Sequence, residues 1–289
     1  MGIQVTSELE ALLTTSDDEF ARRVNDGLKS YTKELEAVVT SVHTWSFTSS
    51  ESLLAIMEGK ARTGDVKGIN KVYWSDLFES IDASRNLFLK RSQPLLQSSV
   101  SLLNEGNLIS SAPIARSLFE LSIWSLQHSA TFKKTLTEYS PQADPALHIM
   151  DATGLQELAL KLIWGTRLKE RTDRNKDLSQ MHIIDQFKKV AKRDDQKYIE
   201  PMYDFLCELC HPNAVGNWLF ADTDELDDGK AQVEILITSK QNGAEKINTI
   251  THLCGCICWS AMALVNASKQ YDEALVWIDD RIGLKKLRH

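Results

Sequence analysis

Residues 107–128 read NLISSAPIARSLFELSIWSLQH, and this stretch decides the fold because as a helix it is apolar on nearly every face. A helix of that kind belongs in the core of a protein. Two charged residues, Arg116 and Glu120, interrupt the apolar surface one helical turn apart. Ionised side chains are almost never fully buried without partners. The pair therefore predicts either a structural ion pair or a functional polar site within a helical core.

Composition places the chain among soluble folded proteins. Its 289 residues are 43% hydrophobic and 25% charged, and this length can bury a large core. The longest apolar run, around 257–265, falls short of the roughly 20 residues that cross a bilayer, so no membrane span is expected. The N-terminus lacks the basic and apolar regions of a secretory signal.

The chain has an odd number of cysteines, which favours a reducing cytoplasm over a disulfide framework: Cys207, Cys210, Cys254, Cys256 and Cys258.

The charge distribution is uneven along the chain. A net charge of −7 argues against a protein whose whole surface binds nucleic acid. Between Lys161 and Lys197, however, eleven Lys or Arg face six Asp or Glu, a local excess of +5. This basic stretch is either an ordinary solvated helix face or a contact surface for RNA.

Helical periodicity dominates, and the predicted fold is all-α. Helices are predicted over 17–45, 51–61, 70–104, 109–138, 153–172, 179–192, 196–210, 245–270 and 271–282, with a kink or boundary at Pro94. Residues 232–238 (QVEILIT) alternate like a strand, with 218–220 as its suggested hairpin partner. We therefore expect a bundle of about eight to ten helices with one small β element near 232–238. The domain prediction is an N-terminal helical arm over 1–64 and a helical core domain over 65–289.

Two polar stripes mark candidate site residues. Arg116, Glu120 and Gln127 share one face of their predicted helix, because positions three or four apart point the same way. In the later segment YDFLCELCHPN, residues Tyr203, Cys207 and His211 form a second stripe at i, i+4 and i+8, just before a proline.

A histidine at a helix end is suited to act as an acid, a base or a phosphate contact. We expect the side chains of Arg116, Glu120 and His211 to lie within hydrogen-bonding distance of one another, directly or through one water. Such a cluster could equally be a structural network that fixes helix register without any chemistry.

The run GNLISSAPIARSLFELSIW and the later YDFLCELCHPNAVGN together resemble an uncharacterised bacterial family of all-helical proteins. That family is distantly similar to the HEPN superfamily of helical ribonucleases and abortive-infection proteins. Carried over residue by residue, the resemblance marks Arg116, Glu120, Tyr203 and His211 as site residues. The chain lacks the closely spaced Arg-to-His motif of HEPN ribonucleases, so a comparable pair would have to come from two helices, as Arg116 and His211.

The cysteines suggest a rival site. Cys207, Cys210 and His211 could join His252, Cys254 and Cys258 as soft zinc ligands. Their spacing is not that of a zinc knuckle, and free cysteines in apolar helices behave as small apolar side chains. We therefore expect no metal and no cofactor.

Two functional classes remain open. The first is a cytoplasmic bacterial defence or stress-response protein of HEPN-like type that acts on RNA or a nucleotide, with Arg116 contacting a phosphate, Glu120 orienting it and His211 as general acid or base. The second is a non-catalytic helical interaction module in which the same residues form a structural network, with another protein or a second copy of the chain as its partner.

Overall fold

The structure of the protein is a computed structural model. It describes residues 5–14, 19–38, 45, 48–138, 153–173, 176, 179, 183–192, 197–211, 216–217, 219, 221–225, 231–235 and 244–284.

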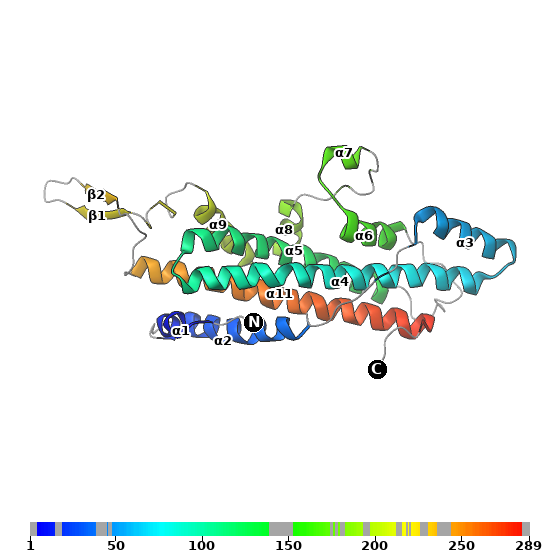
Figure 1. Ribbon diagram of the computed structural model, residues 1–289, viewed down its shortest axis with the longest axis horizontal. Coiled ribbons are helices and arrows are strands. Elements are labelled where there is room, and N and C mark those ends of the chain that lie inside the picture. The colour runs from blue at the N-terminus through cyan, green and yellow to red at the C-terminus, as the bar shows by residue number, and fades with distance from the viewer. Residues whose placement is uncertain are drawn as a thin grey trace. The chain divides into compact units, whose positions relative to one another are not determined.

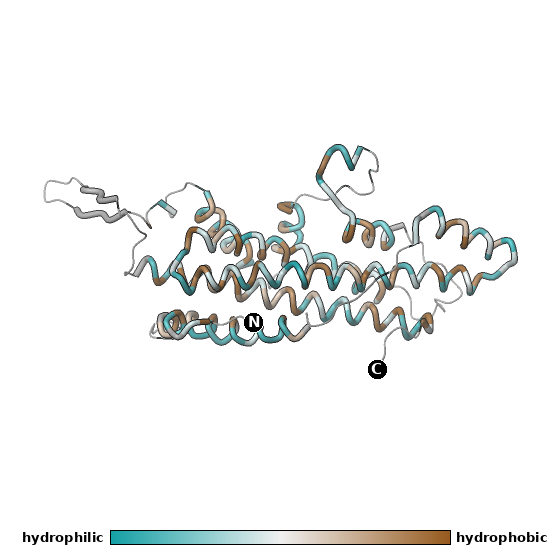
Figure 2. Tube along the Cα trace, viewed as in Figure 1, coloured by the Kyte–Doolittle hydropathy of each residue, from teal (hydrophilic) through white to brown (hydrophobic). Residues whose placement is uncertain are grey.

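The described part of the chain is all-α, which confirms the predicted fold class, and Figure 1 traces its elements. Three long helices dominate: α4 (Val66–Asn104), α5 (Leu108–Glu138) and α11 (Ala244–Ile282). Figure 2 shows apolar and polar residues alternating along them. The shorter helices are α1 (Ser7–Thr14), α2 (Glu19–Val38), α3 (Ser50–Arg62), α6 (Thr153–Trp164), α7 (Lys169–Thr172), α8 (Ile183–Ala191) and α9 (Ile199–Cys210).

Local capping explains where two of the long helices begin. Asp65 accepts a hydrogen bond from the backbone N–H of Gly68 at 2.9 Å, so α4 begins at Val66, earlier than the predicted residue 70. Gly106, with φ of 71°, turns the chain after α4. Asn107 then caps α5 by accepting from the backbone N–H of Ser110 at 3.2 Å.

The structure differs from the predicted helix boundaries at three places. At Pro94 it excludes a boundary, because the buried residues Leu89 and Leu96 on either side favour a continuous helix, and the alternative of a kink stays a prediction. The predicted helices 245–270 and 271–282 are one helix, α11, in which Tyr271 is fully buried. The predicted helix 153–172 is divided into α6 and α7, and Thr166 between them forms a parallel bridge with Ser179.

The small β element is a two-stranded antiparallel hairpin. Strand β1 (Ala221–Glu225) pairs with β2 (Ala231–Ile235), with Thr223 opposite Val233. The predicted strand near 232–238 is therefore present in its described part. Its described partner is β1, whereas residues 218 and 220 of the suggested partner lie outside the described residues.

The chain divides into two compact units, each made of three separate segments. The first unit comprises Met1–Val39, Arg91–Ile123 and Phe187–Val265, and the second comprises Thr40–Lys90, Trp124–Gln186 and Asn266–His289. The separate arm over 1–64 stays a prediction.

In the first unit, α5 and α2 both pack on α11. The buried ring of Phe119 on α5 lies 4.8 Å from that of Trp259 on α11, measured between centroids. On α2, Gly27 faces Cys258 of α11 so closely that an added Cβ would lie 2.7 Å from the sulfur. The close approach of α2 to α11 therefore depends on a residue without a side chain.

In the second unit, aromatic and polar contacts join α4, α5 and α11. The buried Tyr271 ring lies 5.5 Å from Phe88 and 6.1 Å from Phe132. Arg85 forms an ion pair with Asp272 at 2.9 Å, and burial is the main reason that the pKa of Asp272 is raised. These contacts combine an aromatic core with an ion pair that is only partly exposed.

One helix has the length and composition of a membrane span. Over Lys246–Ile282 its most apolar 18-residue window has a mean hydropathy of 1.5, and 78% of that window is buried inside the protein. The core helix of a soluble protein has the same properties. The expectation of no membrane span therefore stays a prediction.

Candidate functional site

Two helices of the first unit carry the predicted site residues. Arg116 and Glu120 lie one turn apart on α5, and Tyr203 lies on α9. His211 is the residue that follows α9, where its backbone N–H donates to the carbonyl of Cys207 at 3.0 Å. The next residue is Pro212, which cannot continue the helix, so sequence fixes His211 at the helix end.

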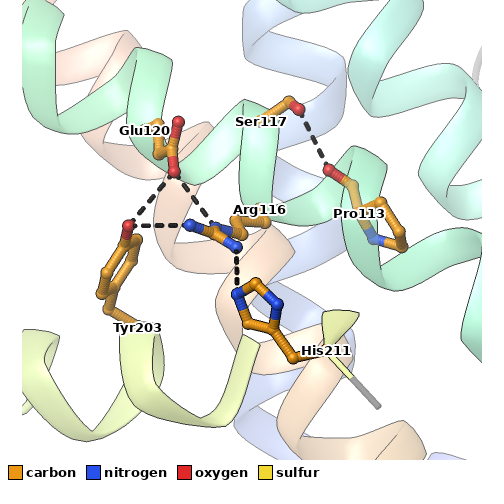
Figure 3. Close-up of polar contacts among 6 residues, drawn as sticks. All are labelled: Pro113, Arg116, Ser117, Glu120, Tyr203 and His211. Atoms are coloured by element: carbon orange, nitrogen blue, oxygen red, sulfur yellow. Dashed lines mark hydrogen bonds and ion pairs between the residues drawn. The ribbon is translucent and has the colours of Figure 1, made fainter. Parts of the chain in front are cut away.

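The guanidinium of Arg116 brings the four residues together, as Figure 3 shows. Its Nε donates to Glu120 Oε1 at 3.1 Å, and its Nη2 donates to the Tyr203 hydroxyl at 3.1 Å. Its Nη1 lies 3.3 Å from His211 Nε2. The Tyr203 hydroxyl in turn donates to Glu120 Oε1 at 3.2 Å. The predicted convergence of Arg116, Glu120 and His211 is confirmed.

The contact between Arg116 and His211 constrains the imidazole. A guanidinium carries only donors, so a hydrogen bond to His211 Nε2 requires that this nitrogen be the acceptor. The ring is then neutral, with its proton on Nδ1. His211 is exposed, so its ring can be approached by a ligand. Its one acceptor nitrogen contacts Arg116 in this arrangement, so it can accept a proton only when Arg116 donates to a ligand instead.

Aromatic rings fix Tyr203 beneath the guanidinium. The Cζ atom of Arg116 lies 5.3 Å from the centroid of the Tyr203 ring, within the range of a cation–π contact. The same ring lies 5.1 Å from Phe187 and 6.3 Å from Phe119. The position of Arg116 thus depends on packing as well as on hydrogen bonds.

The cluster lies at the edge of the core. The side chains of Arg116 and Glu120 retain 26% and 32% of their exposure, so water reaches both members of the ion pair. Burial lowers the pKa of Arg116, but the hydrogen bond and charge contributions of Tyr203, with those of Cys207 and Glu120, outweigh burial and raise it overall. Burial raises the pKa of Tyr203, against the hydrogen bond from Arg116. Arg116 is therefore charged and Tyr203 is neutral near neutral pH.

Two thiols adjoin the cluster. Cys207 belongs to the predicted stripe, whereas Cys210 near Arg116 was not predicted as a neighbour of the site. Burial raises the pKa of both thiols, and the positive charge of Arg116 opposes that rise. Reactive cysteines have a lowered pKa, so these thiols do not have the electrostatics of nucleophiles.

The rival zinc site receives no support from geometry. Within the described residues, no three His, Cys, Asp or Glu side chains are grouped so that they could hold a metal ion. Cys254 and Cys256 are buried in α11, and all five cysteines are free thiols. The absence of a metal remains a prediction for elemental analysis, which should find much less than one zinc per chain.

Gln127, the third residue of the predicted stripe on α5, has a described side-chain hydrogen bond within its own helix. It belongs to the second unit, and its amide donates to Thr131 one turn further along α5 at 3.5 Å. The polar stripe of α5 thus supplies Arg116 and Glu120 to the cluster, while Gln127 bonds within its own helix.

The buried thiols predict a loss of stability in alkaline solution. Burial raises the pKa of Cys254 and Cys256 to about 12, and that of Cys258 to about 11. A thiol in the unfolded chain has a pKa of about 8.5. The contribution of each buried thiol to the free energy of unfolding is therefore fully present below this pKa. It falls as the pH rises towards the pKa of the folded state, by up to about 1.4 kcal/mol per pH unit.

Urea denaturation at pH values from about 7 to 10 measures this fall. Over the same range, the free energy of unfolding of Cys256→Ala should fall less steeply with pH than that of the parent protein. The difference between the two slopes corresponds to about one proton. An equally steep fall in the variant would contradict the raised pKa of the Cys256 thiol.

No protein-family model matches the chain, and no curated protein or solved structure matches it either.

Proposed function

We propose that the chain acts on RNA or a nucleotide through the cluster of Arg116, Glu120, Tyr203 and His211, as an intracellular bacterial defence or stress-response protein of HEPN-like type. The observation that carries the proposal is the 3.3 Å contact between Arg116 Nη1 and His211 Nε2, because it joins an Arg and a His from two helices. HEPN ribonucleases, which the sequence distantly resembles, take such a pair from one short motif.

Each residue has a role in the proposed reaction. When Arg116 turns its Nη1–H group from His211 to the phosphate, the electron pair of His211 Nε2 becomes available. It then accepts the proton of a ribose 2′-hydroxyl, whose oxygen attacks the adjacent phosphorus as the 5′-oxygen of the next nucleotide leaves. The leaving oxygen takes up a proton from water or from the His211 imidazolium. Arg116 stabilises the negative charge on the phosphate. Glu120 and Tyr203 fix the orientation of Arg116.

The guanidinium retains donors for this task. It has five N–H groups, and the contacts with Glu120, Tyr203 and His211 use three of them. The positive charge of Arg116 also acts on the nearby thiol of Cys210, where it opposes the rise in pKa that burial causes. The partial exposure of the ion pair supports access by such a ligand.

The second candidate function is a non-catalytic interaction module. The observation that favours it is that three side chains already orient the guanidinium, as in a structural network that fixes α9 against α5. The partner in this case is another protein or a second copy of the chain.

The test is incubation of the purified full-length protein with end-labelled single-stranded RNA, followed by separation of the products by size. The proposal predicts fragments that end in a 2′,3′-cyclic phosphate, and slower growth of bacteria that express the chain. RNA and nucleotides that remain intact, with unaffected growth, would contradict the catalytic proposal and favour the interaction module.

A further inference from the structure

The second unit exposes two large apolar side chains around the end of α6. Trp164, the last residue of α6, is 54% exposed, and Leu168, which precedes α7, is 63% exposed. Trp164 is the one exposed tryptophan among those whose side chains the structure describes. Tryptophan is highly buried on average, and an exposed one offers a large flat ring for contact with a ligand.

Positive charges lie close to these two residues in the sequence. Arg167, Lys169 and Arg171 are all exposed, and α7 contains no buried residue. Over the sequence 167–176 there are five Lys or Arg against two Asp or Glu, in a chain whose net charge is −7. The local charge thus differs in sign from that of the whole protein, which favours a polyanionic ligand.

The distribution of apolar residues along this segment suits one class of polyanion, nucleic acid, better than an anionic membrane. A helix that lies on an anionic membrane needs a continuous apolar face. Helix α7 has the sequence KERT and no apolar side chain, and it appears mostly as polar residues in Figure 2. What the segment offers instead is one aromatic ring with guanidinium and ammonium groups close to it in sequence. This combination is typical of proteins that stack bases on aromatic rings and contact phosphates with cations.

We propose that the α6–α7 surface, defined as Trp164, Arg167, Leu168, Lys169 and Arg171, binds single-stranded nucleic acid. Trp164 stacks on a base, Leu168 contacts an adjacent base or sugar, and the three cations contact phosphates. Binding needs no chemistry, and all five residues belong to the second unit. The proposal is therefore independent of the Arg116 cluster and of the proposed reaction.

Fluorescence anisotropy of a labelled oligothymidylate of about 12 nucleotides tests this surface in the full-length protein. This DNA probe has no 2′-hydroxyl, so cleavage by the proposed reaction cannot affect the measurement. Trp164→Ala should weaken binding about tenfold, and Trp164→Phe should restore most of the affinity because it keeps an aromatic face. The double variant Arg167→Ala/Arg171→Ala should reduce the slope of log affinity against log salt by about 1.4, for two lost phosphate contacts.

The second unit offers matched controls on α3. Leu54 is 59% exposed and Arg62 is an exposed arginine, so Leu54→Ala and Arg62→Ala should bind as the parent protein does. Unchanged affinity and salt slope in the Trp164 and arginine variants would overturn the proposal. The proposal would also be overturned if these residues were needed for binding to anionic lipid vesicles or to an acidic protein but not for binding to DNA.

Discussion

Replacing His211 by Ala is expected to slow RNA cleavage about 10²- to 10⁴-fold, the contribution typical of a general acid or base. The melting temperature should change little, because His211 is exposed. The measurement is the cleavage rate under saturating RNA, beside a thermal melt of the same preparation. His252→Ala is a matched control, because His252 is also an exposed histidine of the first unit, and its Nδ1 contacts a carbonyl of its own helix at 2.8 Å.

The companion variant Arg116→Ala separates the two candidate functions. It leaves Glu120 without its ionic partner, which in a closed core costs about 3 to 5 kcal/mol. Because the pair retains 26% and 32% side-chain exposure, water can solvate the carboxylate, and we expect a cost nearer 1 kcal/mol. Early unfolding of both Arg116→Ala and His211→Ala would favour a structural network. Folded variants that have lost cleavage would favour the catalytic site.

Replacing Phe119 by Ala is expected to destabilise the protein by about 3 to 5 kcal/mol. Phe119 is fully buried on α5, and its ring lies 4.8 Å from Trp259 and 6.3 Å from Tyr203. The substitution leaves a cavity beside Trp259 and removes a packing contact of Tyr203. Urea denaturation should therefore show a lower midpoint, and any cleavage activity should fall as well.

The exposed Phe20 provides the control for this prediction. It lies on α2 in the same unit and is 43% exposed, so Phe20→Ala should cost about 1 kcal/mol or less. A Phe119→Ala variant as stable as Phe20→Ala would contradict the packing described for α5, α9 and α11.

The positions of the site residues could be predicted because helical spacing determines them. Arg116 and Glu120 are four residues apart, so any helix places them on one face. Tyr203 and His211 are eight apart, close to two turns, and Pro212 ends the helix. Cys210 could not be predicted in the same way, since a cysteine in an apolar helix has no pattern that distinguishes packing from proximity to a charge.

The helix boundaries that were wrong depend on burial, which local sequence does not reveal. The chain around Tyr271 contains no helix breaker, and the buried ring between Phe88 and Phe132 keeps α11 continuous. Pro94 is a breaker by local rules, yet the buried residues of α4 on either side of it maintain the helix. Strand β1 has the sequence ADTDE, and because Asp is depleted in strands, its local sequence does not indicate the pairing with β2.

The most direct test of the Arg116 cluster is a nuclear magnetic resonance titration with a nucleoside 3′-monophosphate. The signals to follow are the Arg116 Nε–H and the His211 ring nitrogens, assigned with the variants Arg116→Lys and His211→Ala. If the cluster binds a phosphate of RNA, both signals shift together along one saturable curve, and the shift is lost in His211→Ala. If neither signal moves at ligand concentrations that saturate the protein, the cluster is not a phosphate site and the proposed function is wrong.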